Sequence, residues 1–348
     1  MDQNSLTSQD LVNLIEEHYN IGTVQSIIPI LDRTSCECFH IVTSTGEYLL
    51  KDVNLDFIYH PYLEPIINNC LLEADIPVST FIKTMTNEYI IHFLGHVFHL
   101  QTFIKGKVLL LHTAPTWFLH SSASLLAKIH KALESISILP SGIGPHYFEI
   151  HTIPSSIASY QNSIRLAQYA QDYTYVKEIE YRINLLSKLQ TLDLSFTSFT
   201  YKNTHGDYSI RQILCGESQI NAVIDFTSCC THPVCWELIR SYVYADPQCQ
   251  SGCIDISNLI DYIEDYLQFS SLNIYDIQMM PYLFLYYLAL NDCFATYYIS
   301  DSIVQKDLKY YINWSTLTLK WLEENVACVS EALANHFSLL EIPSLLSN

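Results

Sequence analysis

The spacing of apolar and polar positions predicts a helix and then a run of strands at the start of the chain. One short amphipathic helix is predicted by four apolar residues that follow Ser8, which would cap it: Leu11, Val12, Leu14 and Ile15. Strands are then expected over residues 23–30, 36–43 and 47–53, with Ser44-Thr45-Gly46 as the turn between the last two.

A second helix and further strands complete the first hundred residues. The helix begins near Pro61 and continues to about Leu72. Strands are predicted over residues 80–82, 88–93 and 97–103. The last of these runs into Ile104-Lys105-Gly106, where the sheet region ends.

From about Thr113 the apolar spacing is mostly that of helices. The pattern predicts one helix over residues 122–133 and two helices over residues 156–190, with a break near Asp172-Tyr173. Two short strands, residues 213–215 and 222–224, interrupt this pattern, and several more helices follow. An antiparallel sheet followed by helices predicts the α+β class.

Length and composition limit the class of protein further. A chain of 348 residues with 49% hydrophobic content can bury the core of one large or two medium domains. The first ten residues are polar and acidic, unlike a secretory signal, and the apolar run at 281–290 is too short to span a bilayer. Eleven cysteines without framework spacing suit a reducing cytoplasm, and zinc is not predicted.

The net charge of −19 argues against nucleic acid as a partner. Between Arg240 and Lys306 there is no lysine or arginine, but there are eight acids: Asp246, Asp255, Asp261, Glu264, Asp265, Asp276, Asp292 and Asp301. These acids either attract a cationic ligand or keep an apolar helical surface soluble.

Two carboxylates flank the short hairpin of residues 213–224. Asp207 follows an apolar run, and Asp225 comes directly after the second strand. Phosphoryl transfer from a nucleotide needs one carboxylate to orient or deprotonate the attacking hydroxyl and another on Mg²⁺. Asp207 suits the first role and Asp225 the second, although two surface aspartates beside a chance hairpin remain an alternative.

His205-Gly206-Asp207 and Ile224-Asp225-Phe226 resemble the catalytic and metal loops of the aminoglycoside phosphotransferase and choline kinase superfamily. That superfamily reads H-G-D-x-x-x-x-N, with I-D-F/W eighteen residues after the first Asp, and the same spacing separates Asp207 from Asp225. The resemblance implies a two-lobed, protein-kinase-like fold. A small antiparallel-sheet N-lobe would cover residues 1–103 and a mostly helical C-lobe residues 104–348, with both loops inside residues 204–226.

The superfamily's asparagine is replaced by Gln212 in this chain. Glutamine carries the same amide oxygen on one more methylene, so it can still reach a metal ion. The resemblance therefore implies Mg²⁺ coordination by Gln212 and Asp225.

The resemblance also implies a nucleotide site for ATP or GTP in the N-lobe. Lys51 would bind phosphate and Glu64 would pair with it, with a solvated lysine and Glu73 as the respective alternatives. The loop hydroxyls of Thr34 and Ser35 would replace a glycine-rich phosphate cover. The hinge between the two lobes would begin where the last strand runs into residues 104–106. Adenine would lie beside it and contact Gln101, Thr102 and Phe103.

In this superfamily the C-terminal helices build the acceptor pocket, here about residues 150–195 and 236–340. An acid-rich pocket suits a cationic acceptor such as an aminoglycoside, which would imply antibiotic resistance. The acids considered as acceptor contacts are Asp246, Asp261, Glu264 and Asp265. His130 is expected to be a packing residue rather than a catalyst.

The resulting prediction is a cytoplasmic, Mg²⁺-requiring O-phosphotransferase that transfers the γ-phosphate of ATP or GTP to a small, cationic molecule. It would bind neither nucleic acid nor membrane, and the sequence leaves its oligomeric state open. One alternative is a metabolic kinase for choline, homoserine or a sugar. The other is a catalytically weak pseudokinase that serves as an interaction module.

Overall fold

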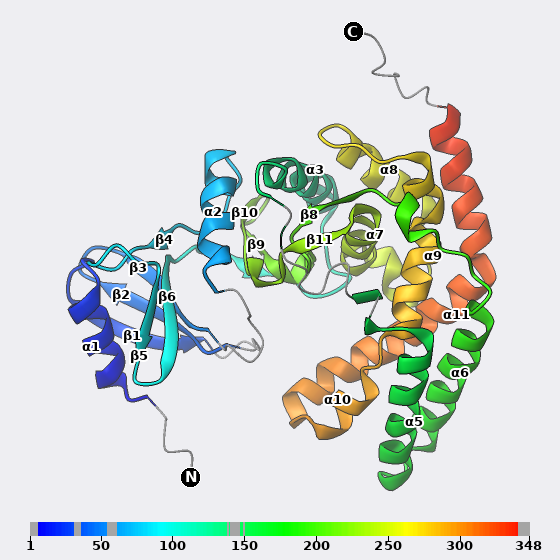
Figure 1. Cartoon of the computed structure of the whole chain (residues 1–348), viewed down its shortest axis with the longest axis horizontal. Coiled ribbons are helices and arrows are strands. Elements are labelled where there is room, and N and C mark those ends of the chain that lie inside the picture. Colours follow the sequence, from blue (N-terminus) through cyan, green and yellow to red (C-terminus); the bar gives the residue numbers. More distant parts are fainter. Residues whose placement is uncertain are drawn as a thin grey trace. The chain divides into compact units, whose positions relative to one another are not determined.

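The computed structural model describes residues 6–30, 36–53, 61–137, 139, 147, 148 and 150–339. The chain divides into two compact units, whose elements are drawn in Figure 1. The sheet unit comprises Met1–Val108 and Gln212–Thr227, and the helical unit comprises Leu109–Arg211 and Ser228–Asn348. The predicted lobe bounds, 1–103 and 104–348, remain a prediction.

An antiparallel sheet with the order β1-β2-β3-β6-β4, and with β5 paired to β6, forms the core of the sheet unit. Its elements are α1 (Ser8–His18), β1 (Val24–Ile30), β2 (Cys38–Thr43), β3 (Glu47–Asp52), α2 (Leu63–Glu73), β4 (Phe81–Ile82), β5 (Ile90–Phe93) and β6 (His96–Thr102). Thr7, not Ser8 as predicted, caps α1, because its hydroxyl accepts from the N–H of Asp10 in a capping box.

Alternate residues of β6 are buried on opposite faces of this sheet. Along β6, Phe98 and Leu100 join an apolar cluster that includes Leu14 of α1. The alternate residues His99 and Gln101 must therefore point to the opposite face, since strand side chains alternate. Both are buried polar residues. Val97, which the same alternation places on this face, joins a small apolar cluster with Cys36, Val53 and Ile90, so this face buries polar and apolar side chains together.

A second, three-stranded sheet of the sheet unit has the order β10-β9-β7. Its strands are β7 (Lys107–Val108), β9 (Ile213–Cys215) and β10 (Ile220–Val223). The predicted hairpin is thus present, with its second strand shifted towards the N-terminus. The N–H of Val223 donates to the carbonyl oxygen of Pro77 at 2.9 Å, which fixes the hairpin within the unit.

The helical unit is built around α7, every residue of which is buried. Helices α5 and α6 pack along one another, and α11 packs along α9 (Figure 1). The elements are α3 (Thr116–Leu133), α5 (Ile153–Tyr169), α6 (Tyr173–Leu189), β8 (Tyr201–Thr204), β11 (Cys230–Pro233), α7 (Val234–Ala245), α8 (Ile256–Leu267), α9 (Ile274–Leu290), α10 (Phe294–Ile299) and α11 (Ser302–Leu339).

The predicted interruption of the long helical stretch lies between α5 and α6. The carboxylate of Asp172 accepts from the N–H of Tyr175 and so caps α6. A sheet unit followed by a mostly helical unit confirms the predicted α+β class. Within the described part of the chain, no helix is long and apolar enough to cross a membrane.

Candidate active site

Lys51 is the centre of a charge cluster in the sheet unit, in which Lys51 and Glu64 are buried and Asp225 is partly exposed. Its ammonium nitrogen lies 2.9 Å from Oδ1 of Asp225 and 3.8 Å from Oε2 of Glu64. Burial alone would lower the pKa of Lys51, but the two carboxylates raise it above its usual value. Burial opposes ionisation of Glu64 as well, and the charge of Lys51 nevertheless lowers its pKa. Glu73, the alternative partner, is exposed.

Asp225 is held in a left-handed backbone conformation, with φ of 62°. Non-glycine residues adopt this region rarely, and at functional sites the surrounding structure supports the strain. Here the hydroxyl of Thr227 donates to Oδ1 of Asp225 at 2.8 Å. The next N–H, that of Phe226, donates to Oε1 of Glu64 at 3.2 Å. Glu64 therefore contacts both Lys51 and the segment that carries Asp225.

Gln212 and Asp225 lie at the same end of the β9–β10 hairpin. The N–H of Ile224 donates to the carbonyl oxygen of Gln212 at 2.9 Å, which brings the two residues close along the hairpin. A carboxylate and an amide oxygen are ligands that suit Mg²⁺, which takes its remaining ligands from phosphates and water. Within the described residues no three His, Cys, Asp or Glu side chains form a protein-only metal cage. A carboxylate and an amide oxygen fit a Mg²⁺ ion that nucleotide phosphates also bind.

Of the predicted adenine contacts, Gln101 and Thr102 end β6 and Phe103 follows it. Part of their hydrogen-bonding capacity is already used. The N–H groups of Thr102 and Phe103 donate to the carbonyl oxygens of Thr80 and Glu47. An adenine ring would therefore have to use carbonyl oxygens here, or N–H groups farther along the chain. The Phe103 ring stacks on His40, with ring centroids 3.8 Å apart. Thr34 and Ser35 lie outside the described residues.

In the helical unit, Asp207 follows β8 and forms an ion pair with Arg240 of α7. Nη2 of Arg240 lies 2.5 Å from Oδ1 of Asp207, and Nη1 donates to the carbonyl oxygen of Tyr208 at 3.4 Å. The guanidinium lies over the rings of Trp236 and Tyr244. Although burial opposes its charge, the carboxylate of Asp207 raises the pKa of Arg240 well above its usual value. Arg240 thus fixes the carboxylate that we predict to be catalytic.

Glu237, one turn before Arg240 on α7, holds the backbone of the same loop. Its carboxylate oxygens accept from the N–H groups of His205, at 3.3 Å, and Tyr208, at 3.2 Å. The imidazole of His130 donates to the same carboxylate at 2.8 Å. Burial opposes ionisation of Glu237, yet the hydrogen bond and charge of His130 lower its pKa to about 2. His130 therefore supports the loop from within the core, as expected of a packing residue.

Glycine is the only residue type that fits at position 206 of this loop. Its φ is 80°, and an added Cβ would lie 1.9 Å from the carbonyl oxygen of Ser228. Glycine adopts this conformation at little cost and leaves room for the neighbouring backbone. The glycine between His205 and Asp207 is thus required by the shape of the loop.

Most of the eight acids between Arg240 and Lys306 do not share one cleft. Asp255, Asp276 and Asp301 accept hydrogen bonds from N–H groups at helix starts. Asp292 accepts from the hydroxyls of Ser159 and Ser163 and from an N–H at the start of α10. These four acids stabilise helix ends and contacts between helices, and none of them is among the acids named as acceptor contacts.

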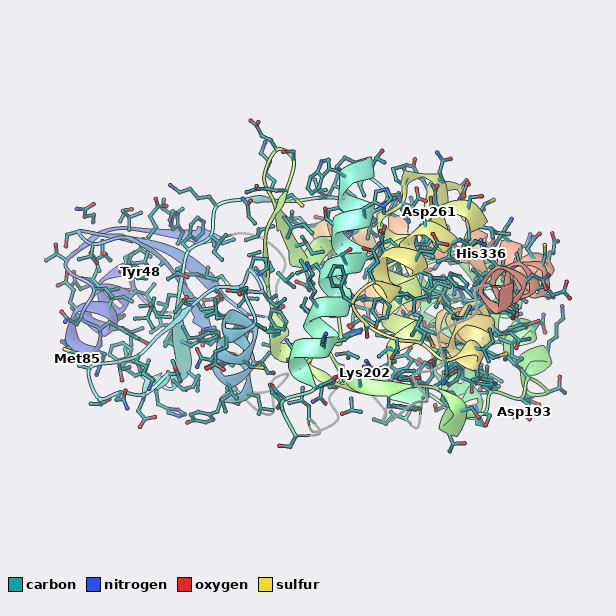
Figure 2. All side chains as sticks on the ribbon, turned by 90° about the horizontal axis from the view of Figure 1, so that it is seen from above. Tyr48, Met85, Asp193, Lys202, Asp261 and His336 are labelled. Carbon is teal, nitrogen blue, oxygen red and sulfur yellow. The ribbon has the colours of Figure 1, made fainter. Side chains whose placement is uncertain are left out.

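A cleft of about 290 Å³ in the helical unit contains three of the four acids named as acceptor contacts: Asp246, Asp261 and Asp265. Asp246 is buried and accepts from the hydroxyl of Tyr242, while Asp265 pairs with His120 at 2.5 Å. Asp261, labelled on α8 in Figure 2, is exposed. Glu264 does not line the cleft and pairs with His336 of α11 at 2.7 Å (Figure 2).

Sequence reasoning missed three residues of the site: His99, Glu237 and Arg240. Their partners lie far along the chain, so no local spacing reveals them. A weak signal did exist for the two α7 residues, because two charged side chains one turn apart in an otherwise apolar helix require buried partners.

Residues 26–265 match the sequence model of the phosphotransferase enzyme family, which is more than half of the chain. The chain belongs to this family. Membership confirms the predicted superfamily and enzyme class, a phosphotransferase with an alcohol group of a small molecule as acceptor. No sequence among curated proteins matches the chain.

Solved structures agree with the family in fold. A spectinomycin phosphotransferase in complex with ADP and spectinomycin has a TM-score of 0.64 at 14% identity, over 95% of this chain and 100% of that one. An aminoglycoside phosphotransferase from Alicyclobacillus acidocaldarius has 0.62 at 14% identity, over 95% and 98%. A microcompartment-associated aminopropanol kinase has 0.60 at 11% identity, over 93% and 99%. These likenesses confirm the predicted kinase-like fold.

Proposed function

We propose that this phosphotransferase moves the γ-phosphoryl group of ATP or GTP to a hydroxyl of a small cationic molecule such as an aminoglycoside. The proposal is carried by the charge cluster of Lys51, Glu64 and Asp225. A family of phosphotransferases supplies the reaction class, and this cluster supplies residues that suit a nucleotide triphosphate. We place the reaction in the cytoplasm, where nucleotide is available, and antibiotic resistance would be its consequence.

Asp207 is the proposed catalytic residue on the acceptor side. Its carboxylate would orient the attacking hydroxyl and accept its proton, while the ion pair with Arg240 fixes where that carboxylate points. In the sheet unit, Lys51 would bind phosphate oxygens and stabilise negative charge during transfer. Phosphoryl transfer depends mostly on positioning and electrostatics, so residues already held in ion pairs suit it.

Gln212 and Asp225 would hold Mg²⁺ together with the nucleotide phosphates. The metal, when bound, neutralises charge on the phosphates as the phosphoryl group transfers. With nucleotide bound, Asp225 would exchange part of its contact with Lys51 for the metal. Lys51 would then be available to phosphate while Glu64 still holds it.

A cationic acceptor is supported by the cleft that Asp246, Asp261 and Asp265 line. Carboxylates in a partly desolvated cleft attract ammonium groups, and the attraction weakens as salt screens it. The aminopropanol kinase among the structural neighbours acts, by its name, on a molecule that carries both an amino group and a hydroxyl. A metabolic kinase for choline, homoserine or a sugar is the second candidate. It is favoured because Asp255, Asp276, Asp292 and Asp301 accept hydrogen bonds at helix starts, which leaves fewer acids for a polycationic acceptor.

An acceptor screen tests this function. Purified protein with Mg²⁺ and either ATP or GTP is incubated with aminoglycosides, other cationic antibiotics, choline, amino alcohols and neutral sugars. Mass spectrometry then detects the gain of one phosphoryl group. We expect a product with an aminoglycoside or another cationic antibiotic. A product only with choline, amino alcohols or neutral sugars would support the metabolic kinase, and nucleotide binding without any product would support the pseudokinase.

A further inference from the structure

A continuous chain of buried polar side chains lies behind the Lys51–Glu64 pair in the sheet unit. It runs through residues of α2, of β6 and of the segment before β4: Asn68, Ser79, Gln101, His99 and Glu64. Each of these five residues is less than a tenth exposed. Burying a polar group costs free energy unless the group is hydrogen-bonded. Five buried polar residues in one continuous row therefore indicate a hydrogen-bonded network.

The direction of the hydrogen bonds is fixed at the far end of this chain. Nδ2 of Asn68 donates to both the carbonyl oxygen and the hydroxyl of Ser79, at 3.0 and 3.3 Å, and a carbonyl oxygen can only accept. The Ser79 hydroxyl then donates to Oε1 of Gln101. The amide nitrogen of Gln101 is therefore left to donate to Nδ1 of His99, at 3.3 Å.

His99 is thereby confined to one tautomer. Because Nδ1 accepts, the proton of the neutral ring lies on Nε2. Nε2 is 3.4 Å from Oε2 of Glu64, and the structure gives it no closer partner among the described residues. A buried N–H without a partner is costly, so this long contact is what satisfies it. Burial also lowers the pKa of His99, which keeps the ring neutral.

We infer that His99 is a positioning residue for the phosphate-binding lysine: its neutral Nε2–H holds the carboxylate of Glu64, and Glu64 in turn holds Lys51. A neutral donor suits this place, because a second cation would compete with Lys51 for the same carboxylate. The inference rests on the proposed function, in which Lys51 binds the nucleotide phosphates.

Two amide substitutions separate this role from mere packing. The side chain of His99→Gln reaches as far as Nε2 and can still donate to Glu64, whereas that of His99→Asn reaches only as far as Nδ1. We expect His99→Asn to raise KM for the nucleotide about tenfold, the size expected for one hydrogen bond to a charged group. His99→Gln should restore most of the affinity, and KM for the acceptor should change little in either variant.

A double-mutant cycle with Glu64→Ala tests whether His99 acts through Glu64. Once Glu64 is removed, His99→Asn should cause no further loss of nucleotide affinity. His96→Gln is the control for loss of a histidine from β6, because Nδ1 of His96 lies 2.6 Å from Oδ2 of Asp52 and not near Glu64. It should leave KM for the nucleotide near the wild-type value. Should His99→Asn fail to fold, Ser79→Ala removes the donor to Gln101 and should weaken nucleotide binding less, about threefold.

Failure of the inference and failure of the proposed function give different results. If Lys51→Met abolishes nucleotide binding but His99→Asn and His99→Gln both match the wild type, His99 has no positioning role. Equal loss in the Asn and Gln variants, or additive loss with Glu64→Ala, would also overturn it. If Lys51→Met itself binds nucleotide normally, the proposed function fails instead.

Discussion

Neutralising Glu237 should destabilise the helical unit by about 3 kcal/mol at neutral pH. The carboxyl is fully buried and has a pKa of about 2, against an ordinary value of 4.5. Each tenfold change in acidity corresponds to about 1.4 kcal/mol, so ionisation in the folded state contributes about 3 kcal/mol. Because no solvent surrounds this carboxylate, screening does not reduce that figure. Gln resembles the protonated carboxyl, so Glu237→Gln removes this contribution.

The pH dependence of this effect has a definite sign. The folded pKa is lowered, so the stabilisation is present above the unfolded pKa of about 4.5 and is lost as the pH falls towards 2. The difference in the free energy of unfolding between wild type and Glu237→Gln should thus be largest near pH 7. By about pH 3 it should fall to less than half of that value.

Urea unfolding followed by far-ultraviolet circular dichroism, at several pH values, measures this difference. Glu134→Gln is the matched control, because Glu134 is half-exposed and pairs with Lys202 on the surface of the helical unit (Figure 2). It should change the free energy of unfolding by less than about 1 kcal/mol. A Glu237→Gln protein that is as stable as the control at pH 7, or whose deficit does not depend on pH, would refute the reasoning.

Three other predictions concern catalysis and substrate binding. Gly206→Ala should lower kcat about 100-fold or more, because the left-handed φ and the crowding of the new Cβ against backbone would displace the loop. Steady-state kinetics measure the loss of kcat, and a thermal melt shows whether the variant is still folded. Asp225→Asn should abolish Mg²⁺-dependent turnover, and Gln212→Asn should keep much more activity than Gln212→Ala; equal activity of the Ala variant and wild type would remove Gln212 from the site. The double substitution Asp261→Asn with Asp265→Asn should raise KM for a cationic acceptor several-fold and leave KM for the nucleotide unchanged. The increase should be smaller at high salt, and a KM that does not depend on salt would contradict a cationic acceptor.

The sequence was sufficient for the parts of the fold that local patterns determine. The strands of the sheet unit and the break before α6 follow from alternation, turn residues and a capping aspartate at 172. The helix cap at the N-terminus was misplaced by one residue, because Thr7 and Ser8 are both good caps and only the geometry decides between them.

The contacts around the predicted site residues could not be read from the sequence. Arg240 meets Asp207 across 33 positions, and Glu64 meets Phe226 across 162, so only the folded chain shows these pairs. The roles of the acid-rich segment could not be read from the sequence for a different reason. Charge density along the sequence ignores where helices begin, and aspartates such as 255 and 301 stand at helix starts for their capping bonds.

The central claim is that Asp207 serves Mg²⁺-dependent transfer of a nucleotide phosphoryl group. The most direct measurement is the initial rate of nucleoside diphosphate formation, with the preferred acceptor and Mg²⁺, in wild type and Asp207→Ala. The account predicts a rate that falls at least about 100-fold in Asp207→Ala, while KM for the nucleotide stays near the wild-type value. A variant that turns over at the wild-type rate, or a wild type with no turnover on any acceptor, would contradict it.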